Sequence, residues 1–416
     1  MEIKRDMYLQ KLIVRKNNGM IKVITGLRRV GKSYLLFTLF KKHLLETGVD
    51  EKHIIQVNLD DINYLEYRKP LELYNYIEGK IIDSNTYFVM LDEVQFVKNF
   101  ETVLNSLLHI ENIDVYVTGS NAKFLSKDII TEFRGRGDQI HLYPLSFSEY
   151  YSAYGGEKFA AFTQYITYGG LPQIAIMDSH EQKKTYLENL FEETYIKDIV
   201  NRHNIRQESD LKELLNVLSS TIGSLTNPHK LANTFKSVKQ SKISSITIDK
   251  YLYYFIDSFL INRATRFDIK GKKYIETPHK YYFSDLGLRN ARINFRQTEI
   301  THLMENAIYN ELIVRGFSVD VGLITMAVKN ENDNMVKKQL EVDFVCNKFD
   351  QRVYIQSAYT LSDAEKLFQE ENSLKKISDS FKKIIITFDP VVTHYNDYGF
   401  CIMNIFDFLL NPDSIN

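Results

Sequence analysis

The sequence predicts an α/β protein with more than one domain, and three observations predict it. Residues 21–25, 87–91 and 114–118 are apolar runs, and each ends in glycine or polar residues, which is typical of buried parallel strands. The chain has 416 residues, enough for two or three domains. Its hydrophobic fraction of 44% is ample for their cores.

The first strand leads into a glycine-rich loop, GLRRVGKS, at residues 26–33. This loop fits the phosphate-binding pattern G-x-x-x-x-G-K-[ST] at every specified position. Gly26 and Gly31 permit a tight turn that directs backbone N–H groups at a β-phosphate. Lys32 would neutralise the β- and γ-phosphate oxygens, and Ser33 would offer its hydroxyl to Mg²⁺. The alternative is a glycine-rich turn that holds no ligand.

The segment after the loop has apolar residues at helical spacing and a stop at Gly48. The phosphates would therefore lie at a helix N-terminus. Arg28 and Arg29 are candidates for contacts to the nucleotide or to a partner, and the sequence leaves their role open. The residues expected around ATP are Gly26, Leu27, Arg28, Arg29, Val30, Gly31, Lys32, Ser33 and Tyr34.

The second run, YFVMLDE at residues 87–93, ends in two adjacent carboxylates. Parallel strands deliver such groups at their carboxyl ends. We expect Asp92 to hold the Mg²⁺ shell and Glu93 to polarise the water that attacks the γ-phosphate. The pair favours hydrolysis of ATP over simple binding. The alternative is a strand end with two solvated acids.

The third strand runs into GSN at residues 119–121, where a polar side chain would sense the γ-phosphate. Ser120 or Asn121 is the candidate sensor, and Thr118 is the alternative. Farther along, Arg134 and Arg136 flank Gly135 on a short loop. Either arginine suits a finger that reaches the γ-phosphate of a neighbouring subunit, in which case activity needs an oligomer. Surface arginines that only pair with acids are the alternative.

Together these strings resemble one group of proteins. RDMYLQKLI, ITGLRRVGKSYLL, MLDEVQ, TGSNAKFLS, FRGRG and YGGLP occur in the order seen in prokaryotic AAA-type ATPases that carry a C-terminal domain of unknown function. The resemblance covers essentially the whole chain. It implies a P-loop ATPase core, then a winged-helix-like domain, then an α/β domain similar to restriction endonucleases of the PD-(D/E)xK type. DNA-linked and defence-linked roles are proposed for relatives.

The expected domains follow from these patterns. They are an ATPase domain at 1–150, a helical connector at 151–209, a winged-helix-like domain at 210–292 and a nuclease-like domain at 293–416.

Charge is unevenly distributed along the second half. Residues 226–292 hold 13 Lys and Arg against 5 Asp and Glu, whereas 301–416 hold 11 against 17. Residues 210–292, which contain the basic stretch, predict three helices and a hairpin, which is the order of a winged helix. Thr247 and Lys250 would face a DNA groove, and the hairpin lysines Lys270, Lys272 and Lys273 would meet phosphates. The alternative is a protein-binding or lid module, with Tyr251, Tyr253, Tyr254 and Phe255 in its core.

The last domain carries part of a nuclease pattern. Glu305 is expected on a helix, and Glu341 and Asp343 on one face of a strand. The next strand would need an acid and a lysine for metal-dependent cleavage, but it reads Gln356, Ser357 and Ala358. We therefore expect this domain to be inactive as a nuclease and to dock partners.

Composition excludes several classes. No apolar run is long enough to span a bilayer, and the amino terminus has no apolar signal core, so a cytoplasmic location is expected. Two cysteines exclude a disulfide framework, and the ten histidines show no metal spacing. The sequence thus predicts Mg²⁺-dependent ATP hydrolysis, with double-stranded DNA as a candidate partner. The alternative function is a slow nucleotide-dependent switch that holds protein partners.

Overall fold

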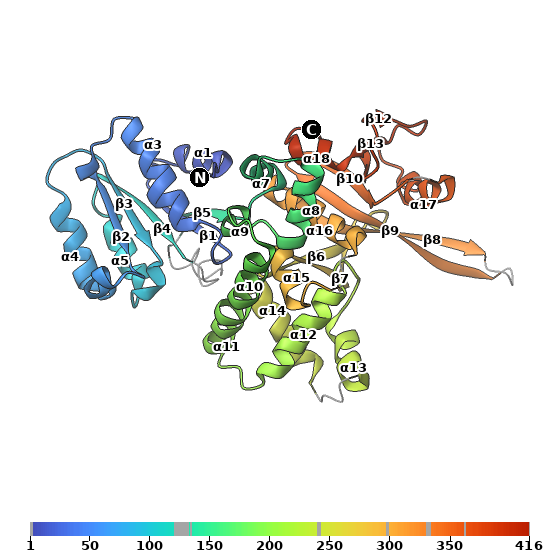
Figure 1. Ribbon diagram of the computed structural model, residues 1–416, viewed down its shortest axis with the longest axis horizontal. Helices are drawn as coiled ribbons and strands as arrows, with labels where there is room; N and C mark the ends of the chain where they lie inside the picture. The colour runs from blue at the N-terminus through green and yellow to red at the C-terminus, as the bar shows by residue number, and fades with distance from the viewer. Residues whose placement is uncertain are drawn as a thin grey trace. The chain divides into compact units, whose positions relative to one another are not determined.

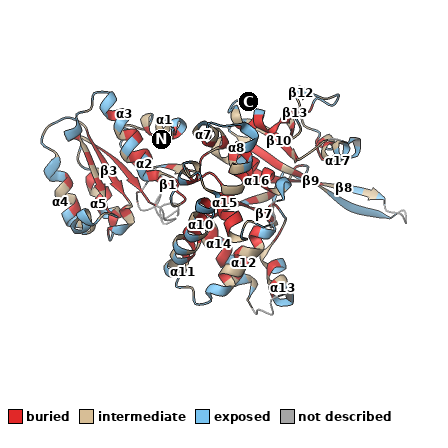
Figure 2. Ribbon diagram, in the orientation of Figure 1, coloured by how far each residue is buried: buried red, intermediate tan, exposed pale blue. Residues whose placement is uncertain are grey.

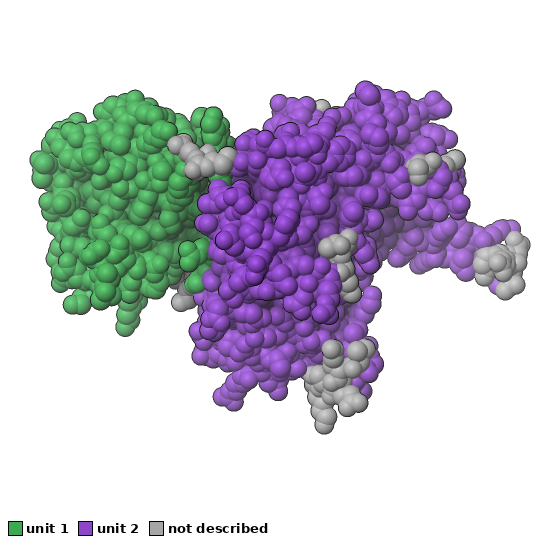
Figure 3. Space-filling model, in the orientation of Figure 1, with its two compact units in different colours: residues 1–144, 257–259 green, residues 145–256, 260–416 purple. Residues whose placement is uncertain are grey.

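The computed structural model (Figure 1) describes residues 3–119, 133, 135–238, 243–296, 299–329, 334–361 and 363–415. The chain divides into two units (Figure 3). Unit 1 comprises residues 1–144 and 257–259, and unit 2 comprises residues 145–256 and 260–416.

Unit 1 is built on a parallel sheet with the strand order β2-β3-β4-β1-β5. Its strands are β1 (Ile21–Gly26), β2 (Ile54–Asn58), β3 (Tyr87–Asp92), β4 (Ile113–Thr118) and β5 (Gly137–Leu142). Its helices are α1 (Asp6–Ile13), α2 (Lys32–Tyr34), η1 (Leu35–Phe40), α3 (Lys41–Glu46), η2 (Glu51–His53), η3 (Ile62–Arg68), α4 (Pro70–Lys80), η4 (Val94–Phe96) and α5 (Phe100–Leu107).

The three predicted strands are confirmed as β1, β3 and β4, and they lie side by side. All residues of β1 and β3 are buried (Figure 2), because apolar side chains leave both faces of these strands. On one face, side chains of α4 and α5 pack in a core with Val23, Val57 and Val89. On the other face, the Phe40 ring of η1 lies 4.7 Å from the ring of Tyr116.

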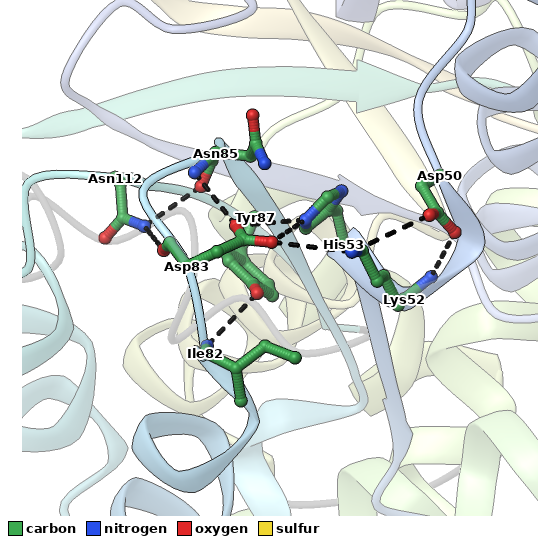
Figure 4. A network of polar contacts seen from close by, with 8 residues as sticks. All are labelled: Asp50, Lys52, His53, Ile82, Asp83, Asn85, Tyr87 and Asn112. Atoms are coloured by element: carbon green, nitrogen blue, oxygen red, sulfur yellow. Dashed lines mark hydrogen bonds and ion pairs between the residues drawn. The ribbon is translucent and has the colours of Figure 1, made fainter.

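At the amino ends of the strands, a polar network joins the segments that precede β2, β3 and β4 (Figure 4). Nε2 of His53 lies 2.9 Å from Oδ2 of Asp83, and the backbone N–H of Asn85 donates to Oδ1 of Asp83. The Asn112 side chain donates to the carbonyl groups of Asp83 and Asn85. The hydrogen bond with His53, followed by that with Asn85, lowers the pKa of Asp83. These contacts fix the edge of the sheet opposite the phosphate-binding loop.

Unit 2 combines a largely helical first half with a mixed sheet. Its helices are α7 (Phe147–Tyr154), α8 (Lys158–Tyr168), α9 (Pro172–Ala175), α10 (His180–Leu190), η6 (Phe191–Ile196), α11 (Lys197–His203), α12 (Glu208–Ser220), α13 (Pro228–Val238), α14 (Ser245–Asp257), α15 (Leu286–Arg292), α16 (Ile300–Val314), α17 (Ala364–Lys375) and α18 (Ile405–Leu410). Its strands are β6 (Ile261–Asp268), β7 (Lys273–Phe283), β8 (Ser318–Lys329), β9 (Met335–Lys348), β10 (Gln351–Ala358), β11 (Lys382–Thr387), β12 (His394–Tyr395) and β13 (Cys401–Asn404).

The first segment of unit 1 ends at residue 144, whereas the expected domain boundary is at 150. Packing explains the difference, because α7 belongs to the core of unit 2. The Phe147 ring lies 5.4 Å from the ring of Phe162 and 6.0 Å from the ring of Phe406. The segment YGGLP separates two helices, since α8 ends at Tyr168 and α9 begins at Pro172.

The expected order of three helices and a hairpin is present as α12, α13, α14, β6 and β7. The hairpin is not a separate wing, however, because β6 pairs in parallel with β8 within one sheet of order β12-β13-β11-β10-β9-β8-β6-β7. The pairing satisfies backbone groups of β6, and Phe267 and Ile269 become buried in the core of that sheet. Strands on both sides of the expected boundary at 292 therefore share one sheet. The winged-helix and endonuclease-like assignments stay predictions.

Asp285, at the N-cap of α15, connects this helix to the YGGLP turn. Its carboxylate, 2% exposed, accepts hydrogen bonds from the backbone N–H groups of Gly170 at 2.7 Å and Leu288 at 3.0 Å. A Cβ atom on Gly287 would lie 2.0 Å from the carbonyl oxygen of Tyr168, so only glycine permits this approach. The turn and α15 thus depend on each other for their conformation.

Within the described part of the chain, no helix is both long and apolar enough to cross a membrane.

Candidate nucleotide-binding site

The phosphate-binding loop lies where the sequence predicts it, between the end of β1 at Gly26 and the start of α2 at Lys32. Gly26 has φ of 143°, and a Cβ atom there would lie 2.1 Å from the carbonyl oxygen of Leu142. Only glycine therefore lets β1 pack so closely against β5 and then turn into the loop. Leu27 and Val30 are buried, whereas Arg29 is exposed with φ of 63°.

Lys32 is folded back over this loop. Its Nζ atom donates to the carbonyl oxygens of Gly26 and Leu27, each at 3.1 Å, and the residue is only 5% exposed. Burial lowers the pKa of Lys32 to about 8, against the opposing influence of Glu93 and Asp92. The ammonium group is thus held by carbonyl groups at the position where the phosphate motif requires a charge.

Asp92 ends β3 beside Ser33 and Thr118. Its carboxylate accepts a hydrogen bond from the Thr118 hydroxyl group, and the residue is 3% exposed. Burial raises the pKa of Asp92, although the hydroxyl groups of Thr118 and Ser33 oppose the shift. The two oxygen groups that the sequence assigns to Mg²⁺, on Ser33 and Asp92, therefore lie close enough for the hydroxyl group to influence the carboxyl group. A hydroxyl and a carboxylate are donors of the type that Mg²⁺ prefers.

Thr118 also contacts the next residue of β3. Its hydroxyl oxygen accepts from the backbone N–H of Glu93 at 3.0 Å, so one side chain joins the end of β4 to both acids. Glu93 has φ of 51° and lies half-buried, with a hydrogen bond from Nε2 of Gln95 to its carboxylate. Ser120 and Asn121, the first candidates for a sensor, lie outside the described residues. Thr118 is the described candidate.

Of the two candidate finger residues, Arg134 lies outside the described residues, and Arg136 is exposed just before β5. The carbonyl oxygen of Arg136 accepts from the N–H of Ile21, which starts β1. The phosphate-binding loop leaves the other end of β1, roughly 17 Å away for a strand of this length. Arg136 therefore lies at the sheet edge opposite the loop of its own unit.

Tyr34 and Arg28 complete the predicted set around the nucleotide. Tyr34 is 36% exposed on α2, and Arg28 is half-buried within the loop.

The basic residues predicted to meet DNA lie on the surface of unit 2. Lys250 on α14 is exposed, and so are Lys270, Lys272 and Lys273 at the β6–β7 turn. Thr247 is half-buried, and its backbone N–H donates to Ser244 at the start of α14. Tyr253 is 58% exposed, so the expectation that it belongs to the core is wrong. It follows Ile246 and Lys250 at helical spacing on the solvent face of α14.

The three acids of the nuclease pattern lie together, but a residue that the sequence did not single out lies among them. Nζ of Lys280, from β7, contacts Glu305, Glu341 and Asp343. The signal for it was a lysine inside the otherwise apolar end of a strand, where Lys280 and Tyr282 share a face. Among the described residues, no group of three or more His, Cys, Asp or Glu side chains is arranged to hold a metal ion.

A loop that turns from β1 into a helix, with an acid at the end of β3 two strands away, defines the nucleotide site of a P-loop NTPase. Comparison with protein families agrees, because residues 18–151 match the AAA domain family. Residues 160–299 match a domain of unknown function, DUF8612.

The chain belongs to the same family as a protein of Haemophilus influenzae, to which it is 33% identical over 391 residues, 92% of this chain and 93% of that protein. A protein of Methanocaldococcus jannaschii is 30% identical over 416 residues, 96% of this chain and 86% of that protein. Among solved structures, the Aeropyrum pernix ORC1 protein in complex with DNA aligns with a TM-score of 0.30 and 11% identity, covering 71% of this chain and 93% of that chain. That likeness is too weak to carry an argument. The AAA domain indicates nucleotide binding and hydrolysis.

Proposed function

We propose that the protein binds ATP with Mg²⁺ at Gly26–Ser33 and hydrolyses it. The observation that carries the proposal is the buried ammonium group of Lys32 in the loop after β1, with the acids Asp92 and Glu93 close to it at the end of β3. A cation, two hard oxygen donors and a further carboxylate are the parts that phosphoryl transfer to water needs. When bound, Mg²⁺ would neutralise charge on the phosphate oxygens.

Each residue of the site has a separate role in ATP hydrolysis. Lys32 and the backbone N–H groups of the loop bind the β- and γ-phosphates, and Ser33 and Asp92 provide oxygen ligands for the ion. Glu93 orients the attacking water and accepts its proton. Thr118 positions both acids, because its hydroxyl group donates to the Asp92 carboxylate and accepts from the backbone N–H of Glu93.

Arg136 is proposed as a finger that acts on a neighbouring copy of the chain. Its place at the amino end of β5 favours action on another copy, since an arginine side chain spans far less than the roughly 17 Å to the loop of its own chain. If the phosphate-binding loop of a second copy lies against this end of the sheet, the guanidinium group of Arg136 would reach the nucleotide bound by that copy. The active form is then an oligomer.

Double-stranded DNA is the proposed partner of unit 2, through the exposed lysines Lys250, Lys270, Lys272 and Lys273. Lysines at a turn contact phosphates without reading sequence, and such binding weakens as salt rises. The test measures ATP turnover with and without DNA at two salt concentrations. Glu93→Gln serves as the blank.

We expect DNA to stimulate turnover at low salt and the stimulation to fade at high salt. The triple variant Lys270→Glu, Lys272→Glu, Lys273→Glu should lose the stimulation and keep its basal turnover. A matched control reverses three exposed lysines of unit 1, Lys42, Lys80 and Lys98. Slow turnover that DNA does not change would instead favour the alternative function, a nucleotide-dependent switch that holds protein partners.

The affinity for ATP should depend on pH through Lys32. Because the pKa of Lys32 lies at about 8, its side chain is charged below this pH and loses its proton above it. Phosphates bind the charged form, so the dissociation constant should rise roughly fivefold to tenfold between pH 7.5 and pH 9. Calorimetry at pH 8.5 in two buffers of different ionisation enthalpy should detect proton uptake on binding. Binding without proton uptake would contradict this role of Lys32.

A further inference from the structure

Lys280 occupies the centre of a carboxylate pocket in unit 2. Its Nζ atom lies 2.9 Å from Oε1 of Glu305 on α16 and 2.7 Å from Oε1 of Glu341 on β9. Oδ1 of Asp343 lies 3.8 Å away, and Lys280 itself is 4% exposed. One buried ammonium group therefore faces three carboxylates that come from two other elements.

The carboxylates are held in place by their own hydrogen bonds. The hydroxyl group of Tyr282 donates to Oε1 of Glu305 at 2.6 Å, and the backbone N–H of Ser357 donates to Oδ2 of Asp343 at 2.9 Å. The N–H of Asp343 donates to Oε1 of Gln356 at 2.8 Å. Hydrogen bonds within the fold thus fix the carboxylates of this pocket, unlike those of exposed ion pairs on the surface.

The balance of charge favours a cation at this position. Burial alone disfavours the ammonium group, but Glu305, Asp343 and Glu341 outweigh it and raise the pKa of Lys280. Burial and the neighbouring Glu305 raise the pKa of Asp343 to about 7, although Lys280 opposes the shift. Without a positive charge, three carboxylates this close together could not all stay ionised.

Converging carboxylate oxygens are also the ligands that hard divalent cations prefer. The ammonium group lies where their oxygens converge, and the described residues contain no arrangement that holds a metal ion. The lysine that the sequence pattern lacks on β10 is supplied by β7, but it fills the space between the acids.

We propose that the ammonium group of Lys280 is the resident cation of this pocket and takes the position that a divalent cation would otherwise occupy. The C-terminal sheet is then assembled around its own positive charge and needs no metal ion. Any dependence of the protein on Mg²⁺ arises at the nucleotide site alone.

The test uses the full chain with Lys280→Met. The methionine side chain follows the lysine stem but ends before the Nζ position, so the substitution removes the charge and keeps most of the packing. Without nucleotide, the variant should bind one Mn²⁺ per chain more than the wild type, with a dissociation constant below about 1 mM. Its melting temperature should rise in Mn²⁺, whereas that of the wild type should not.

Two controls locate the gained ion. The double variant Lys280→Met, Glu305→Gln should lose the additional Mn²⁺, and Lys270→Met, at the exposed turn, should bind Mn²⁺ as the wild type does. If Lys280→Met unfolds by itself, adding Mn²⁺ should restore its native circular dichroism. The proposal is overturned if the variant folds without gaining Mn²⁺, if it stays unfolded in Mn²⁺, or if Glu305→Gln leaves the gained ion in place.

Discussion

Glu93→Gln and Arg136→Ala should each lose ATP turnover, and a mixture of the two variants should regain it. Glutamine cannot accept a proton from water, so the first loss should be about 10²-fold to 10⁴-fold in kcat. An arginine finger contributes about 10³-fold or more. Both variants should still bind ATP with nearly wild-type affinity, because neither residue belongs to the phosphate-binding loop.

Recovery follows from the position of Arg136 at the edge opposite its own loop. In a mixed oligomer, a chain that carries Glu93→Gln presents an intact Arg136 to a neighbour that carries Arg136→Ala. That neighbour retains Glu93, so the shared site contains both groups. If Arg136 acted within its own chain, no site of the mixture would be complete.

The measurement is turnover of each variant and of mixtures in varied ratio, with ATP binding determined in parallel. Arg206→Ala is the matched control, because Arg206 is an exposed arginine of unit 2. Arg134→Ala belongs in the same series, because the sequence predicts either arginine as the finger. Wild-type turnover in both finger variants would refute the finger, and inactive mixtures would refute its action between chains.

The nucleotide site could be predicted because its information is local. Gly26, Lys32 and Ser33 lie within eight residues, and the motif itself specifies the turn, the charge and the hydroxyl group. Asp92 and Glu93 follow from the rule that parallel strands deliver acids at their carboxyl ends. Thr118 was only an alternative, because its hydrogen bonds to two acids depend on the register between β3 and β4.

The organisation of unit 2 could be predicted only in part. Helical spacing identified α12, α13 and α14, but it could not show that β6 would pair with β8, about 55 residues farther along the chain. The position of Lys280 is a similar case. Its partners come from α16 and β9, and no spacing in the sequence connects a lysine on one strand with acids on two later elements.

Asp285→Ala should destabilise unit 2 more than any surface substitution. The change leaves the buried N–H groups of Gly170 and Leu288 without their acceptor, and each such group costs about 1–3 kcal/mol. We therefore expect a loss of about 2–6 kcal/mol in the free energy of unfolding. Because the chain has no tryptophan, urea unfolding is best followed by circular dichroism. Asp249→Ala, an exposed aspartate on α14, is the control and should change stability little.

The pH dependence separates the charge of Asp285 from its hydrogen bonds. Burial raises the pKa of Asp285 to about 6, so the folded chain holds this proton more tightly than the unfolded chain, whose aspartates titrate near 4. The associated stability is complete below about pH 4 and is lost as pH rises through about 6, at most about 3 kcal/mol. Asp285→Asn keeps an acceptor oxygen but cannot titrate. Between pH 4 and pH 7, the free energy of unfolding of the wild type should therefore fall relative to that of Asp285→Asn. A constant difference between the two would show that the buried carboxyl group does not titrate in this range.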